Sequence, residues 1–375
     1  MKFIVSSGLL QKALQAVSGV ISASQSRPIL ENFLFELNKN VFSITATDGE
    51  TTLVTSVEVK SEDTGKIAVP ARIFQDFLKT YNEQPLTLSV KANEEGTGKK
   101  LEILDERDSF SVALDNEEDF PDFPDFDASQ SVFVPSAVLS EAFSNTLFAT
   151  SNDSLRPVMT GVLFQIDDEG ANFVATDSHK LVIYGRKDLY GESMEFIMPK
   201  KPLSIFKNIL GDVNEEVKID LNESMAKFSF GNHVWMCRLI DGKFPNYHAV
   251  IPNESPNVLT INRNLLLSAI KRASIMSNKS TNHIRFKLSG NILHLHAEDT
   301  EFANRADMQI PCEYNGEEMK IGFSSKILLE MLSILSSEDV MIKMSQPNRP
   351  GIIEPVDGLE KDESLLMLSM PVIVN

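Results

Sequence analysis

Two spacings of apolar residues alternate along this chain. Over residues 8–21, apolar side chains recur three and four positions apart, which predicts an amphipathic helix with one buried face. Short apolar or alternating runs follow at 33–37 and 41–45, a pattern typical of β-strands. Both patterns return several times before the chain ends. The sequence therefore predicts an α+β fold in which helices and strands are interleaved.

The helical spacing recurs at 8–21, 71–80, 136–149, 199–211, 262–277 and 324–336. Strands are expected at 2–5, 33–37, 41–45, 52–59, 86–90, 100–104, 110–114, 132–134, 217–221, 226–230, 234–239 and 258–261. The second helix of the first region is predicted to start at Val69-Pro70-Ala71, since Pro is tolerated in a first helical turn. Ile321-Gly322-Phe323 is expected to open the last helix. The apolar stripes also place Ile73 and Ile275 among the inward-facing residues.

The stretch Leu155–Leu181 has weaker copies on both sides. It reads as a strand, a tight turn and a second strand ending in an Ala-Thr-Asp corner, and Arg27–Glu50 and His283–Glu301 follow the same plan. Corresponding points lie about 122 to 129 residues apart, which is the size of a domain and not of a solenoid repeat. The stretches 115–130 and 241–257 each contain a Phe-Pro pair and are expected to be linkers. The predicted domains are 1–126, 127–252 and 253–375.

Charge is distributed unevenly between the helices and the rest of the chain. The formal net charge is −18, which argues against a generic coat for nucleic acid. The six expected helices nevertheless carry +7 together, so the remainder carries −25. Basic helices in an acidic protein favour a protected surface that meets phosphate groups. Solvated helix faces explain the same count equally well. The residues that dominate the count are Lys200, Lys201, Lys207, Arg263, Lys271 and Arg272.

Motifs for catalysis or metal binding are weak in this chain. Asp48, Asp177 and Asp299 recur in equivalent corners, where an Asx turn explains each one without chemistry. His294 and His296 share a strand face but have no third ligand nearby, so a surface pair is favoured over a metal site. No nucleophile motif appears. We therefore predict no enzyme activity, no metal and no cofactor.

The two cysteines are far apart in sequence and lie in apolar segments. Neither a disulfide framework nor a cysteine-based zinc site is expected, and a reducing compartment such as the cytoplasm fits. No apolar run approaches the roughly 18 residues that a membrane-spanning helix needs.

Apolar residues also gather in the middle repeat and in the last eleven residues. The end of the chain, 365–375, is rich in Leu, Met and Val, which is unusual for a terminus that would otherwise fray. Adaptable surfaces rich in Met suit the docking of varied short peptides. A last strand that completes a sheet is the alternative, and the two interpretations are compatible.

Several motifs together resemble one known family. They are Ala-Thr-Asp-Ser-His-Lys-Leu at 175–181, Asp-Gly-Lys-Phe-Pro-Asn-Tyr at 241–247, Val-Pro-Ala-Arg at 69–72 and Met370-Pro371 near the end. With the three repeats, the whole chain resembles the bacterial sliding clamps, the beta subunits of the replicative DNA polymerase.

The resemblance implies a fold and an assembly. Members of this family have the DNA-clamp fold, with two inner helices and outer antiparallel sheets in each of three similar domains. Two chains join head to tail into a ring whose helices line a central hole. Duplex DNA passes through the hole and is held by sequence-blind contacts that allow sliding. The tethered polymerase stays near its template through effective concentration alone.

The resemblance also implies binding residues. Polymerase, clamp-loader ATPase and repair proteins are expected to insert short peptides into a pocket formed by Arg156, Met159, Thr176, His179, Leu181, Pro245, Val250, Leu368, Met370 and Val372. The expected DNA contacts are Arg27, Lys79, Lys200, Lys201, Lys207, Lys271 and Arg272. The protein is accordingly expected in the cytoplasm, associated with the nucleoid.

The chain departs from the family pattern at three places. Pro157-Val158 stands where some relatives have two tyrosines, and the end Met370–Asn375 lacks the terminal arginine of many relatives. Ser24 replaces a basic residue of the first domain, with Arg27 as the nearest substitute. A scaffold that binds peptides without encircling DNA remains the alternative function, and a metal-dependent nucleic-acid enzyme is a more distant one.

Overall fold

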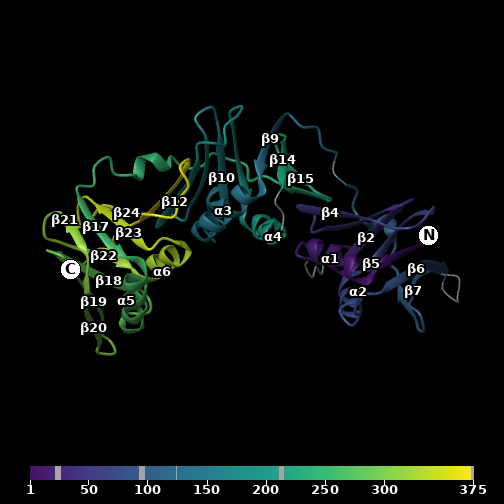
Figure 1. Cartoon of the computed structure of the whole chain (residues 1–375), viewed down its shortest axis with the longest axis horizontal. Helices are drawn as coiled ribbons and strands as arrows, with labels where there is room; N and C mark the ends of the chain where they lie inside the picture. The colour runs from purple at the N-terminus through teal and green to yellow at the C-terminus, as the bar shows by residue number, and fades with distance from the viewer. Residues whose placement is uncertain (22–26, 93–97, 124, 211–214, 373–375) are drawn as a thin grey trace. The chain divides into compact units, whose positions relative to one another are not determined.

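The computed structural model describes residues 1–21, 27–92, 98–123, 125–210 and 215–372 (Figure 1). By its internal contacts the chain divides into two compact units. The first unit contains residues 1–139 and 204–239, and the second contains 140–203 and 240–375. The boundary falls within two helices, α3 (Ser136–Thr146) and α4 (Lys200–Leu210). No helix in the described ranges is long and apolar enough to cross a membrane.

The first unit is built on two antiparallel sheets. An eight-stranded sheet has the order β5-β2-β3-β4-β16-β15-β14-β9, and a four-stranded sheet has the order β1-β6-β7-β8. Helices α1 and α2 lie side by side in this unit, and α1 packs on strands β3 and β4 (Figure 1). The elements are β1 (Lys2–Ser6), α1 (Ser7–Ser18), η1 (Pro28–Glu31), β2 (Asn32–Asn38), β3 (Val41–Thr47), β4 (Thr51–Glu58), β5 (Thr64–Pro70), α2 (Ala71–Leu78), β6 (Pro85–Ala92), β7 (Lys99–Leu104), β8 (Ser109–Ala113), η2 (Glu117–Asp119), β9 (Gln130–Pro135), β14 (Glu216–Leu221), β15 (Met225–Phe230) and β16 (His233–Arg238).

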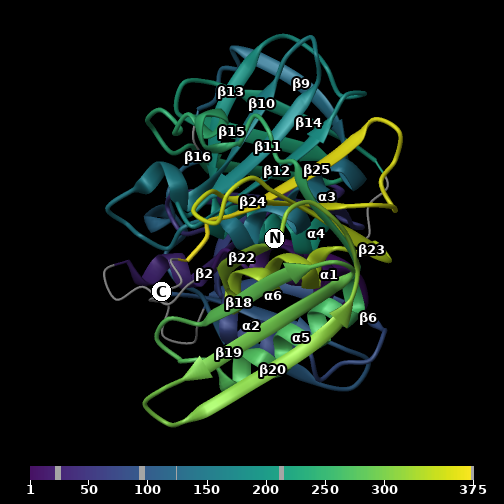
Figure 2. The same cartoon turned by 90° about the vertical axis from the view of Figure 1, so that its left-hand side faces the viewer.

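The second unit has the same kind of construction. A nine-stranded sheet has the order β13-β10-β11-β12-β25-β24-β23-β17-β21, and a four-stranded sheet has the order β20-β19-β18-β22. Helix α5 packs on β19 and β20 and against α6 (Figure 2). The elements are η3 (Leu147–Ala149), η4 (Pro157–Thr160), β10 (Gly161–Ile166), β11 (Ala171–Thr176), β12 (Lys180–Arg186), β13 (Met194–Pro199), η5 (Tyr247–Val250), β17 (Asn257–Asn262), α5 (Arg263–Met276), β18 (His283–Ser289), β19 (Ile292–Asp299), β20 (Asn304–Pro311), β21 (Glu313–Asn315), β22 (Met319–Ser324), α6 (Ser325–Ile334), β23 (Asp339–Met344), β24 (Gly351–Pro355) and β25 (Glu363–Ser369).

The two large sheets repeat one strand arrangement. In the first, Leu34 is paired with Thr45, and in the second the residues 129 positions later, Leu163 and Val174, are paired in the same way. In each sheet the third strand of the motif then pairs with a strand from much later in the chain, β4 with β16 and β12 with β25. The predicted hairpins are therefore confirmed, while their long-range partners are visible only in the structure.

The predicted helices are confirmed, with small changes where strands meet them. The sequence predicted that helices open at Val69-Pro70-Ala71 and at Ile321-Gly322-Phe323. Val69 and Pro70 instead end strand β5, and Ile321–Phe323 belong to strand β22. The helices begin at Ala71 and Ser325. Pro70 is the N-cap of α2, where its missing N–H leaves no helical bond unmade. Ile73 is 62% exposed and Ile275 is 63% exposed, so the prediction that they point inward is wrong.

The predicted linkers are anchored to the sheets by their aromatic residues. Phe120 and Phe244 are both buried, with 4% and 5% of their surfaces exposed. The predicted Asx turns are also confirmed, because Asp48 accepts backbone N–H groups from Glu50 and Thr51 at 3.1 and 2.8 Å. Asp299 accepts the N–H of Glu301 at 3.1 Å. These carboxylates hold corners of the fold in place.

Candidate partner-binding site

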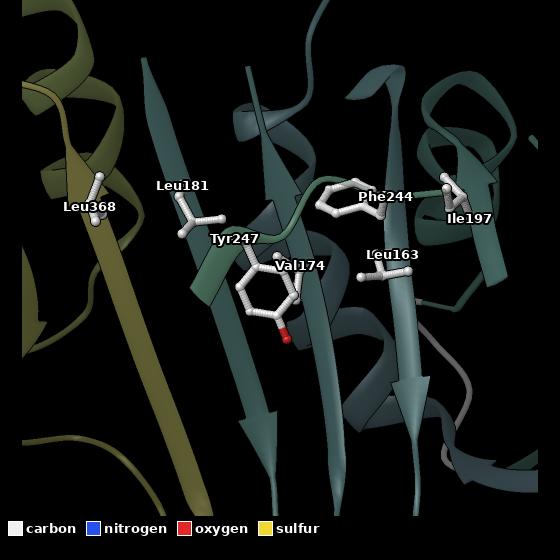
Figure 3. Close-up of a cluster of buried hydrophobic side chains, with 7 residues drawn as sticks. All are labelled: Leu163, Val174, Leu181, Ile197, Phe244, Tyr247 and Leu368. Carbon is white, nitrogen blue, oxygen red and sulfur yellow. The ribbon is translucent and has the colours of Figure 1, made fainter. Parts of the chain in front are cut away.

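An apolar cluster lies on one face of the nine-stranded sheet. Five strands contribute one side chain each, and two aromatic side chains of the linker 241–257 lie over them (Figure 3). The Tyr247 hydroxyl donates a hydrogen bond to the Gln165 side-chain carbonyl at 2.6 Å, which holds the linker on the sheet. The buried members are Leu163, Val174, Leu181, Ile197, Phe244, Tyr247 and Leu368. Half-buried Val158, Ile183, Ile240, Ile251, Leu366 and Met370 pack around them.

A polar cavity of about 850 Å³ also lies in the second unit. Its walls come from the loop after η3, the start of β12, the first turns of α6 and the tail after β25. Its lining is Phe148, Thr150, Ser151, Asn152, Asp153, Arg156, Asp177, His179, Lys180, Lys200, Ser280, Thr281, Ser324, Lys326, Ile327, Glu330, Met370, Pro371 and Val372. Met370 belongs to this cavity and to the edge of the apolar cluster, so the two features are continuous.

Arg156 is held in place by its neighbours. It is the N-cap of η4, and its Nε donates to Asp153 Oδ2 at 2.9 Å while Nη1 donates to the Ser178 hydroxyl. Backbone N–H donation from Leu155 and the Arg156 side chain keep the pKa of Asp153 below its usual range. The Ser178 hydroxyl also contacts the Met159 sulfur at 3.7 Å. These contacts join the loop 151–160 to the turn before β12.

The turn before β12 presents His179 to the cavity. Asp177 Oδ1 accepts the N–H groups of His179 and Lys180, each at 2.9 Å. The Thr176 hydroxyl closes the turn by donating to the Lys180 carbonyl at 2.7 Å. The His179 carbonyl then accepts the N–H of Met370 at 2.9 Å. The turn therefore fixes the backbone of His179 and the start of the tail together, and the imidazole is exposed.

Lys180 was not among the predicted site residues, yet it joins two walls of the cavity. Its side chain is 8% exposed and its ammonium lies 2.6 Å from Glu330 Oε2 and 3.2 Å from Asp177 Oδ2. The ammonium also lies 5.6 Å from the centre of the Phe148 ring. Position 180 lies inside the 175–181 motif, but its partner Glu330 is distant in sequence and no local pattern identifies it.

The structure brings most of the predicted pocket residues together. Arg156, His179, Met370 and Val372 line the cavity. Leu181 and Leu368 are each 1% exposed and belong to the buried cluster below the linker. Thr176 and Met159 support the turn, as described above. Pro245 is half-buried and follows Phe244 directly.

Val250 lies apart from this cavity. It is 47% exposed and lines a second cavity of about 490 Å³, formed by segments 249–256 and 345–350. The tail residues 373–375 lie outside the described part of the chain.

Comparison with known proteins gives a consistent answer along the chain. Family models for the DNA polymerase III beta subunit match with the N-terminal domain at 1–124, the central domain at 133–246 and the C-terminal domain at 248–372. The chain belongs to the DNA polymerase III beta subunit family.

Named relatives of this beta subunit family member cover nearly its full length. The beta sliding clamp of Vibrio cholerae is 29% identical over 99% of this chain and 100% of the relative. The Escherichia coli beta sliding clamp is 28% identical over 92% of this chain and 93% of its own length. A solved sliding clamp of Pseudomonas aeruginosa bound to griselimycin covers 100% of both chains with a TM-score of 0.93 and 28% identity. The clamp fold predicted from the sequence is thereby confirmed.

The basic residues of this beta subunit differ in their surroundings. Lys79 caps the end of α2 and pairs with Asp76 at 2.9 Å. Lys271 and Arg272 are exposed on α5. Arg263, counted above with the basic helix residues, donates instead to the carbonyls of Ser337 and Leu332 at 2.8 and 3.1 Å. Its charge stabilises the C-terminal end of α6.

The other predicted DNA contacts lie at element ends. Lys200 and Lys201 begin α4, and Lys207 lies in its last turn. Arg27 is the N-cap of η1, whereas Ser24 lies outside the described residues. Lys200 also lines the polar cavity, where it donates to the Asn152 side chain at 3.4 Å.

Of the two histidines considered as metal ligands, His296 is paired with a carboxylate. The His296 ring forms a hydrogen bond through Nδ1 to Asp307 Oδ1 at 2.7 Å. Across the described ranges, no group of three or more His, Cys, Asp or Glu side chains has the geometry of a metal site.

Proposed function

We propose that this protein is a sliding clamp that encircles duplex DNA as a homodimeric ring and tethers the replicative polymerase. The observation that carries this proposal is the family relationship along the whole chain, with relatives named as beta sliding clamps. We further propose that its three domains are 1–126, 127–252 and 253–375. It acts in the cytoplasm on nucleoid DNA, and it performs no chemistry of its own.

Contact with DNA is assigned to the basic helices. Lys201, Lys271 and Arg272 are exposed in a protein whose net charge is −18, so the acidic remainder repels phosphate and directs DNA toward them. Contacts of this type release counterions and read no base, which is compatible with sliding. Lys200, Lys207, Lys79 and Arg27 are also assigned contacts with DNA.

Ring closure is assigned to exposed apolar residues near two free sheet edges. In the first unit, Ile73 and Phe110 are 62% and 40% exposed, and β8 is an edge strand. In the second unit, Ile275 and Phe302 are 63% and 73% exposed, and β20 is an edge strand. Head-to-tail pairing of two copies would bury both sets and protect both edges.

Partner peptides are assigned to the apolar cluster and the adjoining cavity in the second unit. Clamp-loader ATPase, polymerase and repair proteins would present short apolar segments there. The corresponding sheet face in the first unit has Thr45 and Thr52 where the second has Val174 and Leu181. Hydroxyl groups replace the apolar side chains, so we propose one partner site per chain.

Encirclement of DNA can be tested by comparing circular DNA with the same DNA after it is cut. Protein loaded on nicked circular DNA by its cognate loader and ATP should remain bound through gel filtration and be lost when the circle is cut once. A ring held only by topology slides off the new ends. Retention on the linear product at the same salt concentration would contradict the proposal.

A charge-reversal variant separates the clamp from a peptide-binding scaffold. Changing Lys201, Lys207, Lys271 and Arg272 to Glu should abolish loading and leave partner-peptide binding largely intact, because none of these four residues lines the polar cavity. A control with the same charge change, Lys60, Lys187, Lys320 and Lys361 to Glu, lies outside the helices and should load. Equal loading of both variants would favour the scaffold or another DNA surface.

A further inference from the structure

Lys326 is an unpaired cation in the wall of the polar cavity. It lies in the first turn of α6, a turn that contains no acidic residue. It is exposed and lines the cavity next to Ile327. Among the described residues, its ammonium group has no hydrogen bond or ion pair. A cation near the positive end of a helix is in an unfavourable position, so a carboxylate placed beside it would be stabilised.

Glu330, the residue on α6 best spaced to pair with Lys326, forms an ion pair with Lys180 instead. Glu330 lies four residues later on α6, the spacing at which lysine and glutamate side chains commonly pair. Its Oε2 instead lies 2.6 Å from the ammonium of Lys180, which is 8% exposed. Because the buried Lys180 has little access to water, its loss of Glu330 would be costly. Glu330 is therefore committed to Lys180.

The other carboxylates of the cavity are also engaged. Asp153 Oδ2 forms an ion pair with Arg156 Nε at 2.9 Å. Asp177 accepts hydrogen bonds from two backbone N–H groups and forms an ion pair with the Lys180 ammonium. No carboxylate among the described residues of the cavity wall is left to compensate Lys326, so a carboxylate of a bound molecule would be stabilised beside it.

We propose that the partner segment bound at this site carries an acidic side chain next to its apolar anchors, and that Lys326 selects it. This inference rests on the proposed peptide-binding function. Ile327, Met370 and Val372 line the same cavity and offer the apolar contacts. Ile327 follows Lys326 on α6, and an extended peptide advances about 3.3 Å per residue, so an Asp or Glu adjacent to a side chain anchored on Ile327 would lie beside Lys326.

The expected contribution is modest and dependent on salt. Lys326 is exposed, and ion pairs of this kind are weakened by solvent screening. Replacing the acidic residue of the peptide with its amide should weaken binding about two- to fivefold at low salt. The difference should shrink at 0.5 M salt, where the Debye length falls to a few ångströms.

The inference can be tested by selecting peptides on the intact protein. Phage-displayed random heptapeptides would be selected on the unmodified protein, on Lys326→Glu and on the control Lys361→Glu. Lys361 is exposed and lies outside the cavity. The unmodified protein and the control should select apolar peptides with Asp or Glu at one position, and Lys326→Glu should lose that acid or select Lys or Arg there.

Fluorescence anisotropy then measures the selected peptide and its Asp→Asn or Glu→Gln form on each variant. An acidic preference that persists on Lys326→Glu would overturn the inference while leaving the peptide site intact. Selected peptides without an apolar pattern, or unaffected by deletion of residues 370–375, would overturn the proposed site and the inference with it.

Discussion

Leu181 of β12 lies directly opposite Leu368 of β25 in the antiparallel register of the nine-stranded sheet. Both side chains are 1% exposed, and Phe244 and Tyr247 belong to the same buried cluster (Figure 3). The last strand therefore supports the candidate partner site from below. Its apolar composition, which suggested a docking surface, is first explained by core packing.

Shortening Leu368 to Ala should destabilise the second unit. Removing a buried leucine side chain leaves a cavity, which costs about 2–5 kcal/mol of unfolding free energy. Urea denaturation followed by circular dichroism would measure the change. Leu359→Ala, at a residue that is 38% exposed, is the control and should change stability much less. Equal effects of the two substitutions would contradict the packing described for β25.

Deleting residues 370–375 should remove partner binding and preserve the ring. The deletion leaves β25 intact and removes two tail contacts, the bond of Met370 N–H to the His179 carbonyl at 2.9 Å and that of Val372 N–H to the Gly322 carbonyl at 2.8 Å. Met370 and Val372 also line the cavity, so the deletion opens one wall. Fluorescence anisotropy with a selected peptide would measure partner binding, and light scattering would measure the mass of the ring. Unchanged peptide affinity would contradict the site assignment.

Changing Ile275 to Arg should convert the ring into single chains. The side chain is 63% exposed, so the folded chain tolerates the charge, but burying it at an interface without a partner is unfavourable. Size-exclusion chromatography with light scattering should give the mass of one chain. Val356→Arg is the matched control, because Val356 is 48% exposed and belongs to neither free edge. A dimer mass for Ile275→Arg would contradict this interface.

Asp220 should contribute stability that depends on pH. It is 5% exposed, and burial by itself raises its pKa, but hydrogen bonds from Lys218 and Ser131 together with the charges of Lys218 and Lys227 outweigh burial and place the pKa below its ordinary value. A lowered folded pKa gives stability above the unfolded pKa of about 4, and this is lost as pH falls through the folded pKa.

Asp220→Asn should therefore be less stable than the unmodified protein at pH 7, with the difference shrinking below about pH 4. Urea unfolding at pH 7, 5 and 3.5 provides the measurement. A stability difference that stays constant across this range would show that the charge of Asp220 is not responsible.

Local patterns predicted the elements and corners of this fold. The helical spacing located the six helices within a few residues, and the recurring Ala-Thr-Asp motif predicted turns in which Asp48 and Asp177 accept backbone N–H groups. Spacing and turn chemistry act over a few residues, so they can be read from neighbours in the chain. The family motifs extended the prediction from single elements to the clamp fold.

The same patterns failed at Ile73 and Ile275, which have helical apolar spacing but are exposed. A stripe of apolar residues shows that one face of a helix will be buried, but it does not show whether the same chain or a second chain buries it. These residues are where we place the contact between two chains, and failures of local prediction are expected at functional surfaces.

The sequence by itself determined the helices, many of the strands and the family to which the chain belongs. The tertiary structure decided that β25 pairs with β12 and that Lys180 takes Glu330 away from Lys326. These pairings join residues far apart in the chain, and they depend on which apolar faces are buried together and on how much water each charge retains. No local spacing encodes either quantity.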